Sequence, residues 1–284
     1  MGPLPSVVTS IVATPSGRGY WLATADGTVD ALGDATDEGS AADVVAPVVA
    51  MAATSDGLGY WLACADGQVL AFGDAPVLGS LPVGTVLAQP IVGMAAAPDG
   101  GGYWLVAADG GVFAFGDSRW YGSTGALPLV SHVVGMAATP DGGGYWLVAA
   151  DGGVFAFGDA RWYGSMGERP LSAPMVGMAA MPGGGGYWLV AADGGVFAFG
   201  EAPWLGSAAG SGPATRVAAM APTPDGHGYW LLEPDQFSYR FGVLSPATAP
   251  RGDTVVAVAA SEAGIDPAAV VANRARHYTP WNAT

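Results

Sequence analysis

The chain has 284 residues, of which 51% are hydrophobic and only 12% are charged, a composition that suits one large, closed all-β domain. Its 46 glycines and 22 prolines predict many tight turns. The net charge is −15 and every basic residue is an arginine, so the surface repels phosphate groups, and we expect no nucleic-acid partner. We also expect no membrane insertion, because no apolar run reaches the roughly 18 residues of a span.

Two further classes of site are excluded by composition. Cys64 is the only cysteine, so the chain can form neither an internal disulfide nor a cysteine metal cluster. The three histidines lack the spacing of metal ligands, and we predict no cofactor. Residues 1–5 contain no basic region followed by an apolar stretch, so we expect no secretory signal in the chain as given.

An internal repeat of about 42 residues organises the chain. The dipeptide Tyr-Trp recurs at positions 20–21, 60–61, 103–104, 145–146, 187–188 and 229–230. Segments 92–123 and 134–165 align without gaps and differ only at Ala97/Thr139 and Ser118/Ala160. This near-identity indicates the duplication of one structural unit.

Each unit reads as four short strands in chain order. In the fourth repeat, the apolar runs are 134–140, 145–150, 154–158 and 161–165, and turns containing Asp-Gly or Gly-Gly separate the first three. Runs of five to seven residues rich in β-branched and aromatic side chains favour strands over helices.

The strands are apolar on consecutive residues, so both faces of each small sheet must be covered. Four-stranded sheets packed face to face around an axis meet this need. We therefore predict an all-β fold, a single β-propeller of four-stranded blades over residues 1–284, with clear repeats at 6–245. A linear β-solenoid is the main alternative.

The number of blades depends on the degenerate segment 246–284. Residues 255–261, VVAVAAS, are similar to the first strand of the other repeats, and the length divided by the period favours seven blades. The alternative is six blades followed by a C-terminal strand or helix. A helix from Pro267 to Tyr278 would have Asp266 as its N-cap.

The string GYWLVAADGGVFAFGDARWYGS at 144–165 resembles a tandem repeat of secreted and cell-surface proteins of actinobacteria. The resemblance covers about 6–245 and implies a β-propeller and an extracellular or cell-surface location. It implies no defined activity and no functional residues. The first and sixth repeats depart from the pattern, and the cell-wall hydrolase or peptidase domains that often accompany this repeat are absent from the chain.

Aspartates recur at two turns of the repeat, for example at Asp151 and Asp159. They could form a ring of calcium ligands, but calcium needs six to eight oxygens around one point. We favour turn chemistry, in which the carboxylate accepts a hydrogen bond from the backbone two residues later.

The aromatic residues of the predicted fourth strand are the candidates for ligand binding. An aromatic face beside an arginine can stack on a sugar ring or anchor a partner protein. The simpler interpretation is packing against the next blade, with the arginine stacked on the tryptophan. The candidate residues are Arg119, Trp120, Tyr121, Arg161, Trp162, Tyr163 and Trp204.

Three functions are compatible with this reading. The first is a non-catalytic binding or scaffolding module that recognises a carbohydrate, another cell-surface or cell-wall polymer, or a protein partner. The second is a structural or receptor-facing virion protein of an actinobacterial phage. The third is a hydrolase or lyase at the channel mouth, using irregular residues of the degenerate repeats: Asp30, Asp37, Glu38, Glu233, Arg240 and His277. We favour the first and expect no enzymatic activity.

Overall fold

A computed structural model describes residues 7–41, 43–210, 216–234 and 238–242. Eighteen strands form six antiparallel sheets of three strands each, paired in chain order, and the described residues contain no helix. Consequently, no described segment is a helix that could cross a membrane. The predicted all-β repeat is confirmed.

We number the sheets 1 to 6 in chain order. Their strands are β1 (Val8–Ala13), β2 (Tyr20–Thr24) and β3 (Val29–Leu32); β4 (Val48–Ala53), β5 (Gly59–Cys64) and β6 (Val69–Gly73); β7 (Ile91–Ala96), β8 (Gly102–Ala107) and β9 (Val112–Gly116); β10 (Val133–Ala138), β11 (Gly144–Ala149) and β12 (Val154–Gly158); β13 (Met175–Ala180), β14 (Gly186–Ala191) and β15 (Val196–Gly200); β16 (Ala219–Pro222), β17 (Gly228–Leu232) and β18 (Ser238–Gly242).

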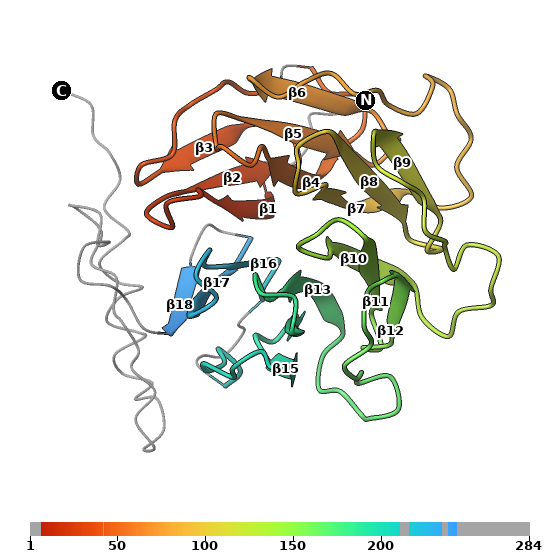
Figure 1. Cartoon of the computed structure of the whole chain (residues 1–284), viewed down its shortest axis with the longest axis vertical. Coiled ribbons are helices and arrows are strands. Elements are labelled where there is room, and N and C mark those ends of the chain that lie inside the picture. Colours follow the sequence, from red (N-terminus) through yellow and green to blue (C-terminus); the bar gives the residue numbers. More distant parts are fainter. Residues whose placement is uncertain (1–6, 42, 211–215, 235–237, 243–284) are drawn as a thin grey trace.

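The middle strand of each sheet is the most buried. In sheets 2 to 5, all six residues of the middle strand are buried, which explains why its sequence does not alternate between apolar and polar residues. The sheets lie around a common centre, with the first strand of each nearest to it (Figure 1). Each first strand lies beside the first strand of the next sheet, and β16 lies beside β1.

The Tyr-Trp dipeptide joins neighbouring sheets. Successive residues of a strand point to opposite faces, so the tyrosine faces one neighbouring sheet and the tryptophan faces the other. Trp146 of sheet 4, for example, packs against Tyr187 of sheet 5, with 5.6 Å between ring centroids. Between sheets 6 and 1, Trp230 packs against Tyr20 at 6.2 Å. The repeat therefore preserves the contact between sheets as well as each sheet itself.

The predicted fourth strand is wrong, since none of the six described sheets has more than three strands. The corresponding residues 119–122 lie between two sheets and are held by side chains. The indole N–H of Trp104 donates to the carbonyl of Arg119 (2.8 Å), and the hydroxyl of Tyr145 donates to the carbonyl of Gly122 (2.6 Å). These bonds satisfy backbone groups that a strand would pair with its neighbour.

The segment proposed as a seventh blade or a terminal helix, residues 246–284, lies outside the described residues.

Candidate functional site

The three predicted tryptophans lie at equivalent positions after β9, β12 and β15 and are open to solvent. Trp120 and Trp162 are each 57% exposed and Trp204 is 60% exposed. In contrast, the strand tryptophans of the same repeats, such as Trp146, are fully buried. Large exposed aromatic side chains at repeated positions are typical of binding surfaces.

Hydrogen bonds hold two of these tryptophans in place. The indole N–H of Trp120 donates to the carbonyl of Val112 (3.1 Å), and that of Trp204 donates to the carbonyl of Val196 (3.1 Å). Each bond ties the ring to the first residue of the third strand in its own sheet. An anchored ring loses little conformational freedom when a ligand stacks on it.

The arginines and tyrosines of the same segments face the next sheet. The guanidinium of Arg161 lies 5.7 Å from the ring centre of Tyr163, and the Tyr163 hydroxyl donates to the carbonyl of Gly184 in the next repeat (2.7 Å). Arg119 and Tyr121 repeat the stacking at 5.9 Å. The packing interpretation therefore holds for the tyrosines, whereas the arginines stack on tyrosine rather than on tryptophan.

A cleft of about 310 Å³ lies between sheets 4 and 5. Its charged residues are Asp141, Asp159 and Arg161, and its walls include Pro140 and Tyr163. The hydroxyl of Thr139 lies 3.4 Å from Oδ1 of Asp159. The sequence predicts Arg161 and Tyr163 as binding residues, but not the cleft beside them.

The pKa values of the two carboxyls of this cleft are shifted in opposite directions. Burial raises the pKa of Asp159 above its usual value, and the neighbouring charge of Asp141 adds to this effect. The Thr139 hydroxyl lowers the pKa of Asp141, and the backbone N–H of Gly143 contributes to this shift.

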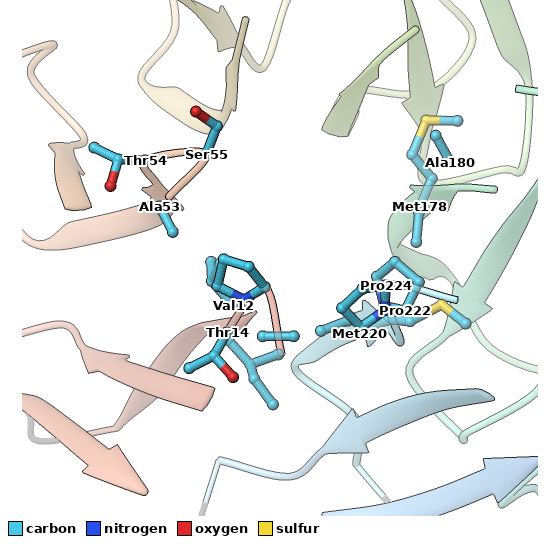
Figure 2. A pocket seen from close by; sticks show the side chains of 15 residues that line it. Val12, Thr14, Ala53, Thr54, Ser55, Met178, Ala180, Met220, Pro222 and Pro224 are labelled. Atoms are coloured by element: carbon cyan, nitrogen blue, oxygen red, sulfur yellow. The ribbon is translucent and has the colours of Figure 1, made fainter. Parts of the chain in front are cut away.

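A second cavity, of about 430 Å³, opens at the centre of the molecule (Figure 2). The lining comes from sheets 1, 2, 5 and 6 and is apolar apart from hydroxyl groups, with Met178, Met220 and Pro222 among its side chains. The hydroxyls of Thr14 and Thr54 in this lining donate to backbone carbonyls. The cavity therefore presents little chemistry beyond apolar contact.

Five of the six residues considered for a hydrolase at the channel mouth lie in the described part of the chain. None of Asp30, Asp37, Glu38, Glu233 and Arg240 lines the central cavity. The guanidinium of Arg240 lies 5.2 Å from the ring centre of Trp230, and buried Glu233 accepts a hydrogen bond from Tyr239 (2.9 Å). His277 lies outside the described residues.

The turn role is confirmed for the aspartates of the second turn, whereas Asp159 of the third turn accepts a hydrogen bond from the Thr139 hydroxyl (3.4 Å) instead. Oδ1 of Asp109, for example, accepts a hydrogen bond from the backbone N–H of Gly111 (2.9 Å), and Asp151 makes the same bond with Gly153 (2.9 Å). Across the described part of the chain, no group of three or more His, Cys, Asp or Glu residues could hold a metal ion.

Neither a protein-family model nor a curated protein matches this chain in sequence comparisons.

Proposed function

We propose that this protein is a six-bladed β-propeller that acts as a non-catalytic binding module for a repetitive cell-surface polysaccharide. The observation that carries this proposal is the solvent exposure of Trp120, Trp162 and Trp204 at equivalent positions of three consecutive repeats. We call these three residues the tryptophan array.

Closure with six blades is supported by a hydrogen bond that follows the repeat. Along the chain, the first strand of a sheet donates to the preceding repeat, as in Val48 N–H to Ala25 O (3.0 Å) and Val133 N–H to Ala108 O (2.8 Å). The equivalent bond between the first and last sheets, from Val8 N–H to Pro234 O, measures 3.4 Å. Together with the Trp230–Tyr20 contact, it favours sheet 1 as the direct neighbour of sheet 6.

The choice of a polysaccharide follows from the chemistry of the array. Indole rings stack on the apolar C–H face of a sugar, and each aromatic contact contributes about 1 kcal/mol. Three equivalent sites on one rigid scaffold bind a repeating chain through summed weak contacts. The net charge of −15 favours a neutral or basic polymer over an anionic one. A location outside the cell rests on the sequence resemblance alone.

The experiment compares wild type with Trp120→Ala/Trp162→Ala/Trp204→Ala on a polysaccharide array and on isolated cell walls. Each stacking contact of about 1 kcal/mol corresponds to about fivefold in affinity, so the triple variant should lose about a hundredfold. The matched control is Val77→Ala, because Val77 occupies the same position in repeat 2 and is 89% exposed. This variant should bind like wild type.

Val77→Trp extends the array to a fourth repeat and should bind more tightly than wild type. Unchanged binding in the triple variant would refute the role of the tryptophan array. Binding to proteins of the cell wall, but to no polysaccharide, would replace the polymer by a protein partner.

A further inference from the structure

The cleft between sheets 4 and 5 combines residues that are common to the repeat with one that is not. Thr139, whose hydroxyl lies 3.4 Å from Oδ1 of Asp159, has a threonine counterpart in repeats 1, 2 and 6. Ala160, which follows Asp159, has an alanine counterpart in repeats 1, 2 and 5. The two differences between segments 92–123 and 134–165 are therefore departures of repeat 3 from the common pattern.

Gly183, on the opposite wall, is the residue of the cleft that departs from the repeat. Repeats 2, 3, 4 and 6 carry an aspartate at this position, namely Asp56, Asp99, Asp141 and Asp225. A Cβ atom added to Gly183 would meet no other atom within 4 Å, and Gly183 does not adopt the positive φ that favours glycine. Backbone geometry therefore does not require the glycine, and its lack of a side chain leaves this wall of the cleft open.

The charged groups of the cleft have hydrogen-bonding capacity to spare. Arg161 forms no ion pair or side-chain hydrogen bond with another described residue, and its only side-chain interaction is the stacking on Tyr163. Its five N–H donors are thus free to meet a ligand. The carboxylates of Asp141 and Asp159 supply acceptors on the same cleft.

This combination matches one class of ligand. A sugar ring offers hydroxyls that both donate and accept hydrogen bonds, together with an apolar face that can lie against Pro140 and Tyr163. An anionic group would be repelled by the two carboxylates and attracted by only one guanidinium. A ring without hydroxyls would leave the polar groups of Asp159 and Arg161 unpaired when water is displaced.

We infer that the cleft between sheets 4 and 5 is a binding pocket for a single neutral sugar ring. Asp141 and Asp159 accept from its hydroxyls, Arg161 donates to them, and Gly183 admits the ring. This inference takes its ligand class from the proposed function. Its site is separate from the tryptophan array, since exposed Trp162 does not line the cleft.

The test is a titration of the ¹⁵N-labelled full chain with D-glucose, D-galactose, D-mannose and N-acetyl-D-glucosamine, followed by NMR. At least one sugar should cause saturable shifts of the amides at 139–143, 159–163 and 183–185. The indole N–H of Trp146, which lines the cleft and donates to the carbonyl of Arg161, should shift with them. No saturable shift in this set with any of the four sugars overturns the inference.

Gly183→Asp is the decisive variant, because it installs the residue of the neighbouring repeats in open space. It should fold like wild type and weaken the sugar more than tenfold. Asp159→Asn, which keeps the shape of the side chain and removes its charge, should also weaken binding. If both variants titrate like wild type, the pocket is refuted.

The triple tryptophan variant separates the two proposals. If the sugar still shifts the amide signals of the cleft in this variant, the pocket is independent of the tryptophan array. If these shifts are lost, the inference of an independent pocket is overturned. If at least one of the four sugars binds the cleft but no polysaccharide binds the tryptophan array, the proposed function fails while this inference stands.

Discussion

Tyr187 illustrates how single residues connect the sheets. Its ring packs against Trp146 of sheet 4 at 5.6 Å, and its hydroxyl donates to the carbonyl of Gly164 at 2.6 Å. The same hydroxyl oxygen accepts the backbone N–H of Tyr163 at 3.2 Å. Burial raises the pKa of this phenol, so the hydroxyl stays protonated and available as a donor at neutral pH.

Tyr187→Phe should destabilise the protein by about 1–3 kcal/mol, because it leaves a carbonyl and an N–H without their partner. The free energy of unfolding from urea titrations, monitored by tryptophan fluorescence, measures the effect. The comparison variant is Phe199→Leu in the same sheet, a change that removes no hydrogen bond. A change for Tyr187→Phe within experimental error would mean that water replaces the hydroxyl.

The carboxyl pair of Asp141 and Asp159 predicts a pH dependence of stability. The pKa of Asp159 is higher in the folded protein than in the unfolded chain, so the ionised carboxylate destabilises the folded protein at a pH above the folded-state pKa. This destabilisation is lost as the pH falls from the folded-state pKa to the unfolded-state pKa, because Asp159 becomes protonated. Asp159→Asn should therefore be more stable than wild type at pH 7, with a difference that shrinks in acid. The lowered pKa of Asp141 acts in the opposite sense: its contribution is present above the unfolded pKa and is lost as the pH falls through the folded one.

Thermal midpoints of wild type and Asp159→Asn between pH 3 and pH 7 test this expectation, and ¹³C NMR of the carboxyl groups assigns the two pKa values. A difference that grows in acid would contradict the direction given for Asp159.

At the scale of elements, the hairpin of β11 and β12 depends on a close approach of two backbones. Gly158, the last residue of β12, pairs with Gly144 and has a φ of 70°. A Cβ atom at Gly158 would lie 2.3 Å from the carbonyl oxygen of Gly143. Glycine is required here by both the positive φ and the lack of space.

Gly158→Ala should cost about 1–3 kcal/mol from the backbone conformation, and more if the hairpin has to shift. Gly183→Ala is the matched control, because a Cβ atom at Gly183 meets open space and φ is not positive. Urea midpoints of the two variants measure the difference. Equal midpoints would show that the hairpin accommodates the methyl group at Gly158 without cost.

The segments RWYGS at 119–123 and 161–165 have the composition of a strand, so the sequence predicts one at this place in the repeat. Which groups pair with its backbone could not be read from the repeat itself. The partners of residues 119–122 include Tyr145, which belongs to the next repeat, and Trp104, whose indole takes the place of a backbone donor. Composition predicts an extended chain, but not which groups bond to it.

At the scale of the whole molecule, the first and last sheets share a buried cluster. Ile11 and Leu22 of sheet 1 pack with Trp230 and Leu232 of sheet 6. If the six sheets form one closed ring, this interface should contribute to stability as much as an interface between neighbouring repeats in the middle of the chain.

Leu22→Ala should then cost about 2–5 kcal/mol, close to the cost of Leu105→Ala between sheets 2 and 3. Buried Cys64 provides a second probe, because its thiol becomes reactive only when sheet 2 opens. In both variants, thiol labelling and tryptophan fluorescence should report one transition. Separate transitions in Leu22→Ala would indicate that sheet 1 unfolds alone and that the ring is not closed.

Local sequence patterns are enough to predict the repeat, the strand and turn order of its first three runs, and the turn role of Asp109 and Asp151. These features depend on local chemistry: short apolar runs pair across Asp-Gly and Gly-Gly turns whatever surrounds them. Only the tertiary structure shows that Trp120 meets water while Trp146 is buried, and that Arg161 of repeat 4 and Gly183 of repeat 5 line one cleft. Exposure and proximity depend on how one sheet packs against the next, and residues from different repeats come together only when that packing forms.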